Sequence, residues 1–326
     1  MIVDSGQGSK GTAFRGESSV NHLHPKTFTE VIARGFPHGQ LDALRQAQAA
    51  RVRGRPFPSA PRLTRAAVVD TTRKDAGNNF SPDEQTAFKN AILQLVQEGK
   101  YLELTQDHMD MSHNMHGSMG EVGLYRFLAW HRRYLVEFQK ELQRVDAILR
   151  PGATEKLGVP YWRWEDPIPE WMEGYLPATD PESGQPVPPR KDAPPPNKAN
   201  AGDIDIIVNQ FQIQNTQLPG ENDYSKFTYG LEGWGLRPDG TSLPAHNHGH
   251  AWIGGIMNNT STSPTDPMFW LHHAEADRLW QIWRQTHPTP GPPLEGSDRI
   301  MDPWSESYDN LLDIAGLGYA YDSMTL

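Results

Sequence analysis

The sequence predicts a mainly α-helical protein, a four-helix bundle with long loops and few short strands. Apolar residues recur at alternating steps of four and three residues in several segments, which is the spacing of helices with one buried face. The chain of 326 residues contains 29 glycines and 28 prolines, a content that indicates many fixed turns between these helices. It also contains 13 histidines, and several of them occupy apolar positions of the expected helices.

The chain divides into two parts by its periodicity. Residues 1–62 contain Gly, Pro, Ser and His with little periodicity, so we interpret them as an irregular N-terminal extension. Residues 63–326 carry the helical patterns and are interpreted as one core domain. Within it, residues 177–203 hold eight prolines and are expected to form a long exposed loop, too short to separate two domains.

Two helices are expected at the start of the core domain. The first covers residues 82–98, because Ser81 provides an N-cap, Pro82 suits the first helical position and Gly99 ends the segment. The second is expected over residues 101–116, where apolar residues and histidine share one face.

Three more helices are expected further along the chain. Residues 122–149 give the clearest pattern, a strict alternation of steps of four and three that includes His131. Residues 243–253 and 267–286 repeat this spacing and also place histidines on the apolar face. Four helices therefore direct histidine into an apolar interior.

Charge and composition exclude several classes of function. The 40 acidic and 30 basic residues give a net charge of −10, and no basic stripe is present, so we expect no nucleic-acid partner. No apolar run reaches about 18 residues, so no membrane span is expected, and no signal peptide is visible at the N-terminus. The absence of cysteine excludes disulfides, thiolate metal ligands and cysteine nucleophiles.

Nine of the histidines fall into two clusters. Each cluster is spread over two segments; the members are His108, His113, His116 and His131, then His246, His248, His250, His272 and His273. A buried imidazole without a partner costs free energy, so histidines on the apolar faces of four helices need a common explanation. A single one is ordinarily a hydrogen-bonded core residue, but this number favours a metal site.

Spacing indicates which histidines of the second cluster are ligands. His246 and His250 are four residues apart, so both rings can reach one ion from one face of a helix. The adjacent His272 and His273 point about 100° apart on a helix, so they are not expected to share an ion. The apolar steps of residues 267–286 include His273, which favours His273 as the ligand.

The all-nitrogen donor set favours copper. Imidazole suits zinc, copper, iron or nickel. A zinc peptidase needs Glu directly after the first His of a His-x-x-x-His pair, and this chain has Asn247 there. Iron bound by two histidines and one carboxylate needs an acid on the apolar faces, which supply none. Two sites of three histidines each fit two copper ions, which together can give O2 two electrons.

Two long motifs contain histidines of these clusters. Residues 127–135 read FLAWHRRYL, and residues 266–280 read DPMFWLHHAEADRLW. Both resemble the copper motifs of the tyrosinase and polyphenol oxidase family, and the segments 159–164, 246–255 and 319–322 also match it. The resemblance covers about residues 63–322 and is nearest to the short bacterial type. It implies a type-3 dicopper centre with O2 as co-substrate.

The resemblance implies six histidine ligands. Each copper ion has three of them. They are His108, His116 and His131 for the first ion, and His246, His250 and His273 for the second ion. The middle ligand of the first ion departs from the family pattern, because relatives usually place it where this chain has Val122. We expect a loop insertion to shift it to His116, with His113 as the alternative.

The resemblance also implies two residues that act on the substrate. Glu232, in the segment LEGW, and Asn247 resemble the pair that holds a water molecule near the second copper ion in relatives. Such a water can take the proton of a phenol, whose pKa is about 10, because the phenolate is the form that binds copper. The alternative for Glu232 is a surface carboxylate. Ala251 is small and is expected to leave the entrance open, and Thr260 lies where relatives gate the site.

The expected activity is ortho-hydroxylation of monophenols and oxidation of o-diphenols to o-quinones with O2. Small phenols are the expected substrates, and the need for a copper-delivery partner is left open. Three alternatives remain. They are a catechol or o-aminophenol oxidase without hydroxylase activity, a non-enzymatic O2-binding dicopper protein, and a hydrolytic zinc enzyme.

Overall fold

The computed structural model describes residues 25–37, 69–190, 198–210, 223–287 and 291–326. Helices dominate these residues, and the prediction of a mainly α-helical fold is confirmed. Apart from short 3₁₀ and π turns, the elements are α1 (Phe28–Arg34), β1 (Thr71–Arg73), α3 (Pro82–Gln97), α4 (Lys100–Met109), α5 (Glu121–Leu149), α6 (Ala201–Asp205), α7 (Asp223–Glu232), α8 (His246–Ile253), α9 (Met268–Thr286) and β2 (Tyr319–Tyr321).

The first predicted helix, α3, begins where the sequence places its cap. The side chain of Ser81 accepts a hydrogen bond from the backbone N–H of Glu84, and the Glu84 carboxylate accepts one from the backbone N–H of Ser81. Two N–H groups that the helix leaves free are thus satisfied, and Pro82 follows at the first helical position.

The second helix, α4, is shorter than predicted. The pattern predicts residues 101–116, but α4 ends at Met109. Asp110 leaves the helical conformation, and its side chain accepts a hydrogen bond from the N–H of Ser112, which starts a 3₁₀ turn. Asn114 then takes a positive φ of 49°. Residues 110–120 therefore form an irregular loop, because polar side chains satisfy the backbone there instead of a helix.

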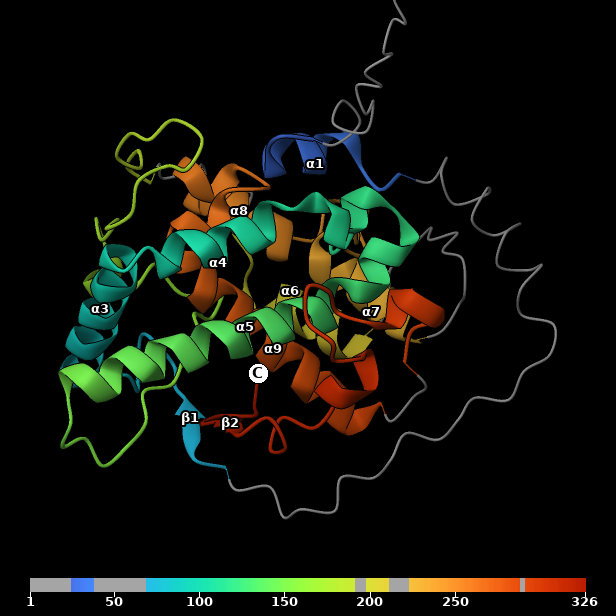
Figure 1. Cartoon of the computed structure of the whole chain (residues 1–326). Helices are drawn as coiled ribbons and strands as arrows, with labels where there is room; N and C mark the ends of the chain where they lie inside the picture. Colours follow the sequence, from blue (N-terminus) through green and yellow to red (C-terminus); the bar gives the residue numbers. More distant parts are fainter. Residues whose placement is uncertain (1–24, 38–68, 191–197, 211–222, 288–290) are drawn as a thin grey trace, which may run out of the picture.

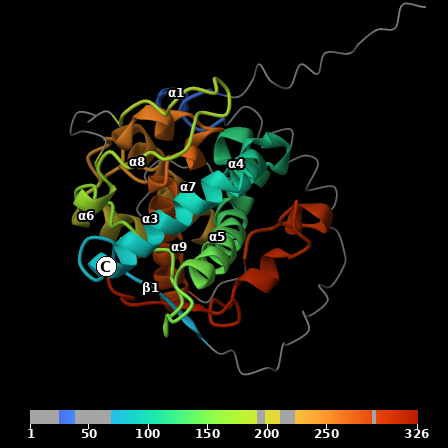
Figure 2. The ribbon, with the colours of Figure 1, turned by 60° about the vertical axis from the view of Figure 1, so that its left-hand side comes forward.

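Helix α5 crosses the middle of the molecule and packs against α3, α7 and α9 (Figure 1). Its bounds agree with the predicted 122–149 to within one residue. The turned view in Figure 2 shows α3 and α5 side by side. The ring of Phe138 on α5 stacks on Trp270 of α9 with a centroid distance of 3.8 Å. This packing fixes the histidines of α5 and α9 relative to each other.

A buried charged network joins both ends of the core domain. β1 and β2 pair in parallel, with Thr71 opposite Tyr319. Beside them Asp277 of α9 forms ion pairs with Arg73 of β1 and Arg132 of α5. The hydroxyl of Tyr319 donates a hydrogen bond to the same carboxylate. Because all these charged groups are buried, each depends on the others for a partner.

Two segments differ from their sequence predictions, one of an irregular N-terminal extension and one of an exposed loop. Helix α1 lies within residues 1–62, where an irregular extension is expected; residues 1–24 and 38–62 lie outside the described part. The stretch 177–203 is not wholly exposed, because the nearly buried side chain of Arg190 pairs with Asp266 at 2.6 Å, and α6 begins inside it. Helix α7 forms over Asp223–Glu232, where the sequence analysis predicts no helix.

Helix α8 also differs from its prediction. The pattern predicts residues 243–253, but the helix begins at His246. Ser242 instead forms an antiparallel bridge with Leu236, and the N–H of Leu243 donates to the carbonyl of Gly235. α9 agrees with its prediction to within one residue.

Candidate metal centre

Three imidazole nitrogens of the second cluster converge and form the second set, made of His246, His250 and His273. The Nε2 atom of His246 lies 3.1 Å from Nε2 of His250 and 3.1 Å from Nε2 of His273, and the last two are 3.3 Å apart. All three side chains are buried. α8 supplies two of them one turn apart, and α9, packed against α8, supplies the third.

Three residues of the first cluster also converge and form the first set, namely His108, His116 and His131. Nε2 of His108 on α4 lies 3.3 Å from Nε2 of His116, which precedes a 3₁₀ turn. His131 of α5 completes this set, with one nitrogen from each residue within 4.8 Å of the others. The rings of His131 and His273 stack at 4.3 Å, so the two sets lie side by side.

Backbone carbonyls orient these rings from behind. The Nδ1 atoms of His108, His131 and His250 lie 2.8 to 3.0 Å from the carbonyl oxygens of Ser261, Phe127 and Met257. A carbonyl can only accept, so the proton of each neutral ring is on Nδ1. The Nε2 lone pairs therefore face the other imidazoles, as in metal-binding histidines.

Burial keeps the rings neutral. It lowers the pKa of His108 to about 4 and lowers the pKa values of His131, His246, His250 and His273 well below the usual range of histidine. Neutral imidazole is the form that ligates a metal. At neutral pH the interior thus presents lone pairs and no positive charge.

The residues fit a pair of metal ions. Nε2 of His131 is buried and has no hydrogen-bond partner among the described residues. Lone pairs held about 3 Å apart without protons between them repel one another, and a buried polar atom without a partner costs free energy. A cation bound by each set removes both costs. Three imidazoles per ion, without thiolate or carboxylate, is a donor set that suits copper.

Three neighbouring histidines have other partners. Nδ1 of His113 lies 2.6 Å from Asp302 Oδ2, so the ring is held away from the first set. Nε2 of His248 lies 2.9 Å from Ser242 Oγ. His272 also has a nitrogen within 4.8 Å of His246 and His250. Its Nε2 donates to the carbonyl of His246 at 3.1 Å, and its Nδ1 has no hydrogen-bond partner among the described residues. Nε2 of His273 lies 3.1 and 3.3 Å from the Nε2 atoms of His246 and His250, and this convergence favours His273 as the third member.

Glu232 is a buried carboxylate next to the first set, not a surface residue. It lies at the end of α7, is 1% exposed, and accepts hydrogen bonds from the backbone N–H of Gly117 at 2.8 and 3.0 Å. Its Oε1 is 3.9 Å from Nδ1 of His116. Burial raises its pKa to about 8, although the Gly117 N–H opposes this change.

Asn247 contacts His246 of the second set on one side and approaches Gly233, next to Glu232, on the other. Its Oδ1 atom is 3.0 Å from Nδ1 of His246, and its Nδ2 atom has no hydrogen-bond partner among the described residues. A Cβ on Gly233, the neighbour of Glu232, would lie 3.2 Å from the Cβ of Asn247, and Gly233 has a φ of 111°. The two predicted substrate residues are thus neighbours, one beside each set.

The entrance is covered, contrary to the expectation from Ala251. The ring of Phe28 on α1 stacks on His250 with a centroid distance of 3.9 Å. Thr260, expected to gate the site, donates from Oγ1 to the carbonyl of Pro25. Periodicity missed this contact of Phe28 with the centre, although Thr27-x-x-Glu30 before apolar residues is a helix-start pattern.

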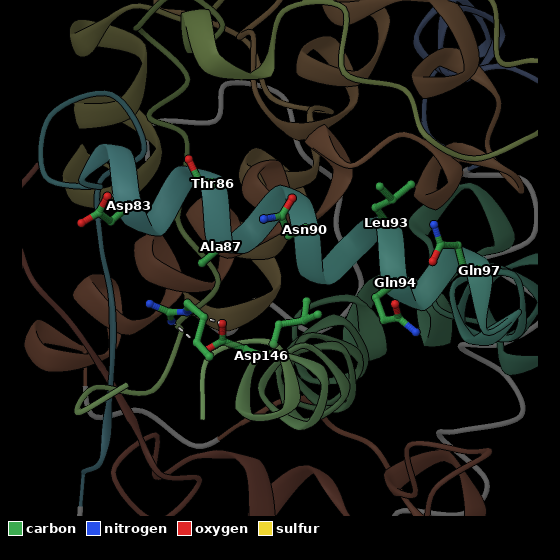
Figure 3. Close-up of a pocket in the computed structure, with 10 residues that line it drawn as sticks. Asp83, Thr86, Ala87, Asn90, Leu93, Gln94, Gln97 and Asp146 are labelled. Carbon is green, nitrogen blue, oxygen red and sulfur yellow. Dashed lines mark hydrogen bonds and ion pairs between the residues drawn. The ribbon is translucent and has the colours of Figure 1, made fainter. Parts of the chain in front are cut away.

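A separate pocket of about 540 Å³ lies between α3 and the C-terminal end of α5 (Figure 3). Asp83, Asn90 and Gln94 line it together with Asp146 and Arg150, which pair with each other. It contains none of the clustered histidines, so it is not part of this centre.

Comparison with known proteins identifies the family. The family model described as the common central domain of tyrosinase matches residues 97–187 and 175–286. The tyrosinase of Streptomyces glaucescens is 31% identical over 281 residues, which cover 74% of this chain and 96% of that protein. The chain belongs to the tyrosinase family. Its centre is accordingly a dinuclear copper site that uses O2, and the chain is a copper-dependent phenol oxidase.

Solved structures show the same fold as this tyrosinase-family chain. A functional unit of octopus haemocyanin matches with a TM-score of 0.56 at 18% identity, over 78% of this chain and 69% of that one. A recombinant mushroom tyrosinase matches with a TM-score of 0.55 at 19% identity, over 78% of this chain and 62% of that one. Among the described residues, no helix has both the length and the apolar character needed to cross a membrane.

Proposed function

We propose that this chain hydroxylates monophenols at the ortho position and oxidises the resulting o-diphenols to o-quinones. The observation that carries this proposal is the buried Glu232, held by Gly117 N–H beside the first histidine set and next to Asn247. An oxidase of diphenols alone has less need of a buried base, because its substrate offers two hydroxyl oxygens to the metal ions.

His108, His116 and His131 would hold one copper ion, and His246, His250 and His273 the other. The copper pair, when bound, supplies the electrons that activate O2. Small phenols are the proposed substrates, in keeping with the name of the relatives.

The protein's own groups prepare the phenol. A phenol oxygen near the second set comes within reach of the Glu232 carboxylate, directly or through one water. In its ionised form Glu232 takes the proton at a carboxylate oxygen. Nδ2 of Asn247, which has no hydrogen-bond partner among the described residues, donates a hydrogen bond that orients this water. The buried surroundings exclude other water, so the phenolate forms where it is used.

The test is the variant Glu232→Gln. Glutamine keeps the size of the side chain and an oxygen that can accept the Gly117 hydrogen bonds, but it cannot take a proton. We expect the rate with tyramine to fall about 100-fold or more, the range that a positioned base contributes. The rate with catechol should fall much less. Oxygen uptake with each substrate gives the ratio of the tyramine rate to the catechol rate.

Glu275→Gln is the matched control. Glu275 is also a buried carboxylate, but it pairs with Arg278 and not with the histidine sets. Its loss should weaken the fold without changing the tyramine-to-catechol ratio. Equal loss of both activities in Glu232→Gln would contradict the proposal. A wild-type chain that oxidises catechol but not tyramine would indicate an oxidase without hydroxylase activity.

A further inference from the structure

A row of aromatic rings leads from the first set to the molecular surface. The ring of Trp130 on α5 lies 5.0 Å from the ring of His131 and 5.9 Å from that of His108, measured between centroids. The same indole lies 5.4 Å from the ring of Trp304. Trp130 is fully buried, whereas Trp304 is partly exposed. Centroid distances of this size are those of rings in contact, so the row is continuous from the histidines to solvent.

The two indoles are held at a fixed distance. Nε1 of Trp130 donates a hydrogen bond to the backbone carbonyl of Asp302 at 2.7 Å, two residues before Trp304. The short turns on both sides of Trp304, Gly296–Arg299 and Tyr308–Leu311, pack against α5 (Figure 1). The rate of electron transfer between two groups falls steeply with the gap between them. A gap that the fold keeps short therefore favours transfer.

The side chains of this row differ in their ability to pass electrons. Indole gives up an electron more readily than most side chains and can keep its proton, so Trp130 can pass an electron while Nε1 stays bonded to the carbonyl. Tyr134 also contacts both indoles, at 5.1 and 6.1 Å. An oxidised tyrosine must release its proton, but the hydroxyl of Tyr134 donates to the backbone carbonyl of Leu104, which is not a base. The electron-passing pair is therefore Trp130 and Trp304.

Trp304 suits the outer end of the row. Its side chain is partly exposed, so the oxidised indole can release its proton to water and can be reached by a donor in solution. The guanidinium of Arg133 lies 4.7 Å from the centroid of this ring. A second positive charge so close is unfavourable, which favours release of the proton. Arg133 is held there by Glu137 and Glu306, at 3.0 and 3.1 Å.

We propose that Trp130 and Trp304 form an electron route that returns the metal centre to rest when O2 has been activated and no phenol is bound. An oxidising centre without such a route attacks its own ligands. The route does not depend on the hydroxylation of monophenols, because it uses only the oxidising power of a copper-dependent phenol oxidase.

Each passage along the route moves one electron. Trp130 gives an electron to the centre and takes one from Trp304, which loses its indole proton to water. An o-diphenol in solution then returns one electron and one proton to Trp304 and becomes a radical. O2 that already holds two electrons from the copper pair receives two electrons by two passages. With four protons from solvent, it becomes two molecules of water.

Hydrogen peroxide without phenol tests the route in the wild-type chain. Peroxide with the oxidised copper pair contains the same number of electrons as O2 with the reduced pair. The full-length, copper-loaded chain is treated with peroxide, and mass spectrometry of its peptides locates added oxygen. We expect at least about tenfold more oxidation at Trp304 than at Trp130, His108 or His131. Oxidised histidines beside an intact Trp304 would overturn the proposal.

Trp171 is the internal control for direct attack by peroxide. It is also partly exposed, but its ring packs on Phe80 and Phe88, away from the histidine sets. We expect oxidation of Trp304 to exceed that of Trp171 in the copper-loaded chain and to match it in the copper-free chain. Equal oxidation of both residues in the copper-loaded chain would overturn the proposal.

Two substitutions separate electron transfer from packing. Trp304→Phe keeps an aromatic ring that does not give up an electron, so oxidation of Trp130 and His131 should rise at least about tenfold. Trp304→Tyr should restore most of the protection, because a partly exposed phenol can release its proton. Trp171→Phe is the matched control and should stay within about twofold of wild type. Equal oxidation of Trp130 in the Phe and Tyr variants would overturn the proposal.

Ferrocyanide provides a second readout. This anion is too large to reach the buried histidines, so it must give its electron at the surface. With peroxide, the wild-type chain should form ferricyanide, and Trp304→Phe should form it at least about tenfold more slowly. Equal rates would show that electrons bypass Trp304 and would overturn the proposal. Ferricyanide formation as expected, in a chain that does not hydroxylate tyramine, would support the route and contradict the proposed function alone.

Discussion

At the scale of single residues, the hydrogen-bond partner of one ring nitrogen separates the two histidines of the loop before α5. His116 and His113 are three residues apart in one irregular loop, yet only His116 directs Nε2 at His108, whereas His113 is held by Asp302. This assignment could not come from spacing, because α4 ends at Met109 and the helical period ends with it. His246, His250 and His273 lie on regular helices, and their convergence was predictable from the sequence.

Replacing the two loop histidines should therefore have different effects on copper content. We expect His116→Asn to bind one copper ion per chain instead of two, because the first set loses a ligand. His113→Asn is the control and should keep two. Copper per chain after dialysis, measured by plasma mass spectrometry, checks this. One copper ion in His113→Asn and two in His116→Asn would show that His113 is the ligand.

At the scale of elements, the loop before α5 must approach Glu232 closely. A Cβ on Gly117 would lie 2.5 Å from Glu232 Oε2 and 3.0 Å from Trp234 Nε1. Gly117→Ala should therefore displace the loop that carries His116. We expect a loss of about 1–3 kcal/mol in the free energy of unfolding, as for other overpacked sites, together with weaker copper binding.

Gly152→Ala is the control for this loop, because nothing lies within 4 Å of its added Cβ. Its free energy of unfolding should change by less than about 0.5 kcal/mol. Chemical denaturation of both variants without copper gives the comparison. A Gly117→Ala chain as stable as Gly152→Ala would show that the contact with Glu232 is not tight.

The elements also show what periodicity can predict. α3, α5 and α9 follow their patterns to within one or two residues because capping residues or a buried face fix them. α1 was missed because seven residues give too few turns for a period to be visible. Its stability comes from Phe28 and Val31, which are buried against other parts of the chain, and no local pattern reports such contacts.

At the scale of the whole molecule, Asp277 pairs with Arg73 and Arg132, which lie 204 and 145 residues from it along the chain. Asp277→Asn leaves two buried guanidinium groups without their charged partner. We expect a loss of about 3–5 kcal/mol in the free energy of unfolding. Asp309→Asn is the control, since its pair with Arg299 is partly exposed and should contribute less than about 1 kcal/mol. Denaturant unfolding measures both, and equal losses would contradict this account.

The same network predicts a dependence of stability on pH. Burial by itself raises the pKa of Asp277, but Arg132 and Arg73 lower it by more, so the folded pKa is below the usual 3.8. Its stabilising contribution is complete above pH 3.8 and is lost as the pH falls through the folded pKa. The difference in unfolding free energy between wild type and Asp277→Asn should therefore shrink below pH 3.8. A constant difference down to pH 2 would contradict this.

Fold class and most of the site were predictable because the same helices build both. The bundle and five of the six proposed ligands follow from apolar periodicity with histidine on the buried faces. The pairing of β1 with β2 and the Asp277 network were not predictable, because they join segments about 250 residues apart without a local pattern. The boundary at residues 62 and 63 lies outside the described residues and stays a prediction.

The central claim is that two sets of three imidazoles hold a pair of copper ions. Copper content and electron paramagnetic resonance of the oxidised full-length chain test it together. We predict two copper ions per chain without a signal, because two neighbouring Cu(II) ions couple their spins, and one ion with a signal in His116→Asn. One metal ion per wild-type chain, or two that give signals of isolated Cu(II), would contradict the claim.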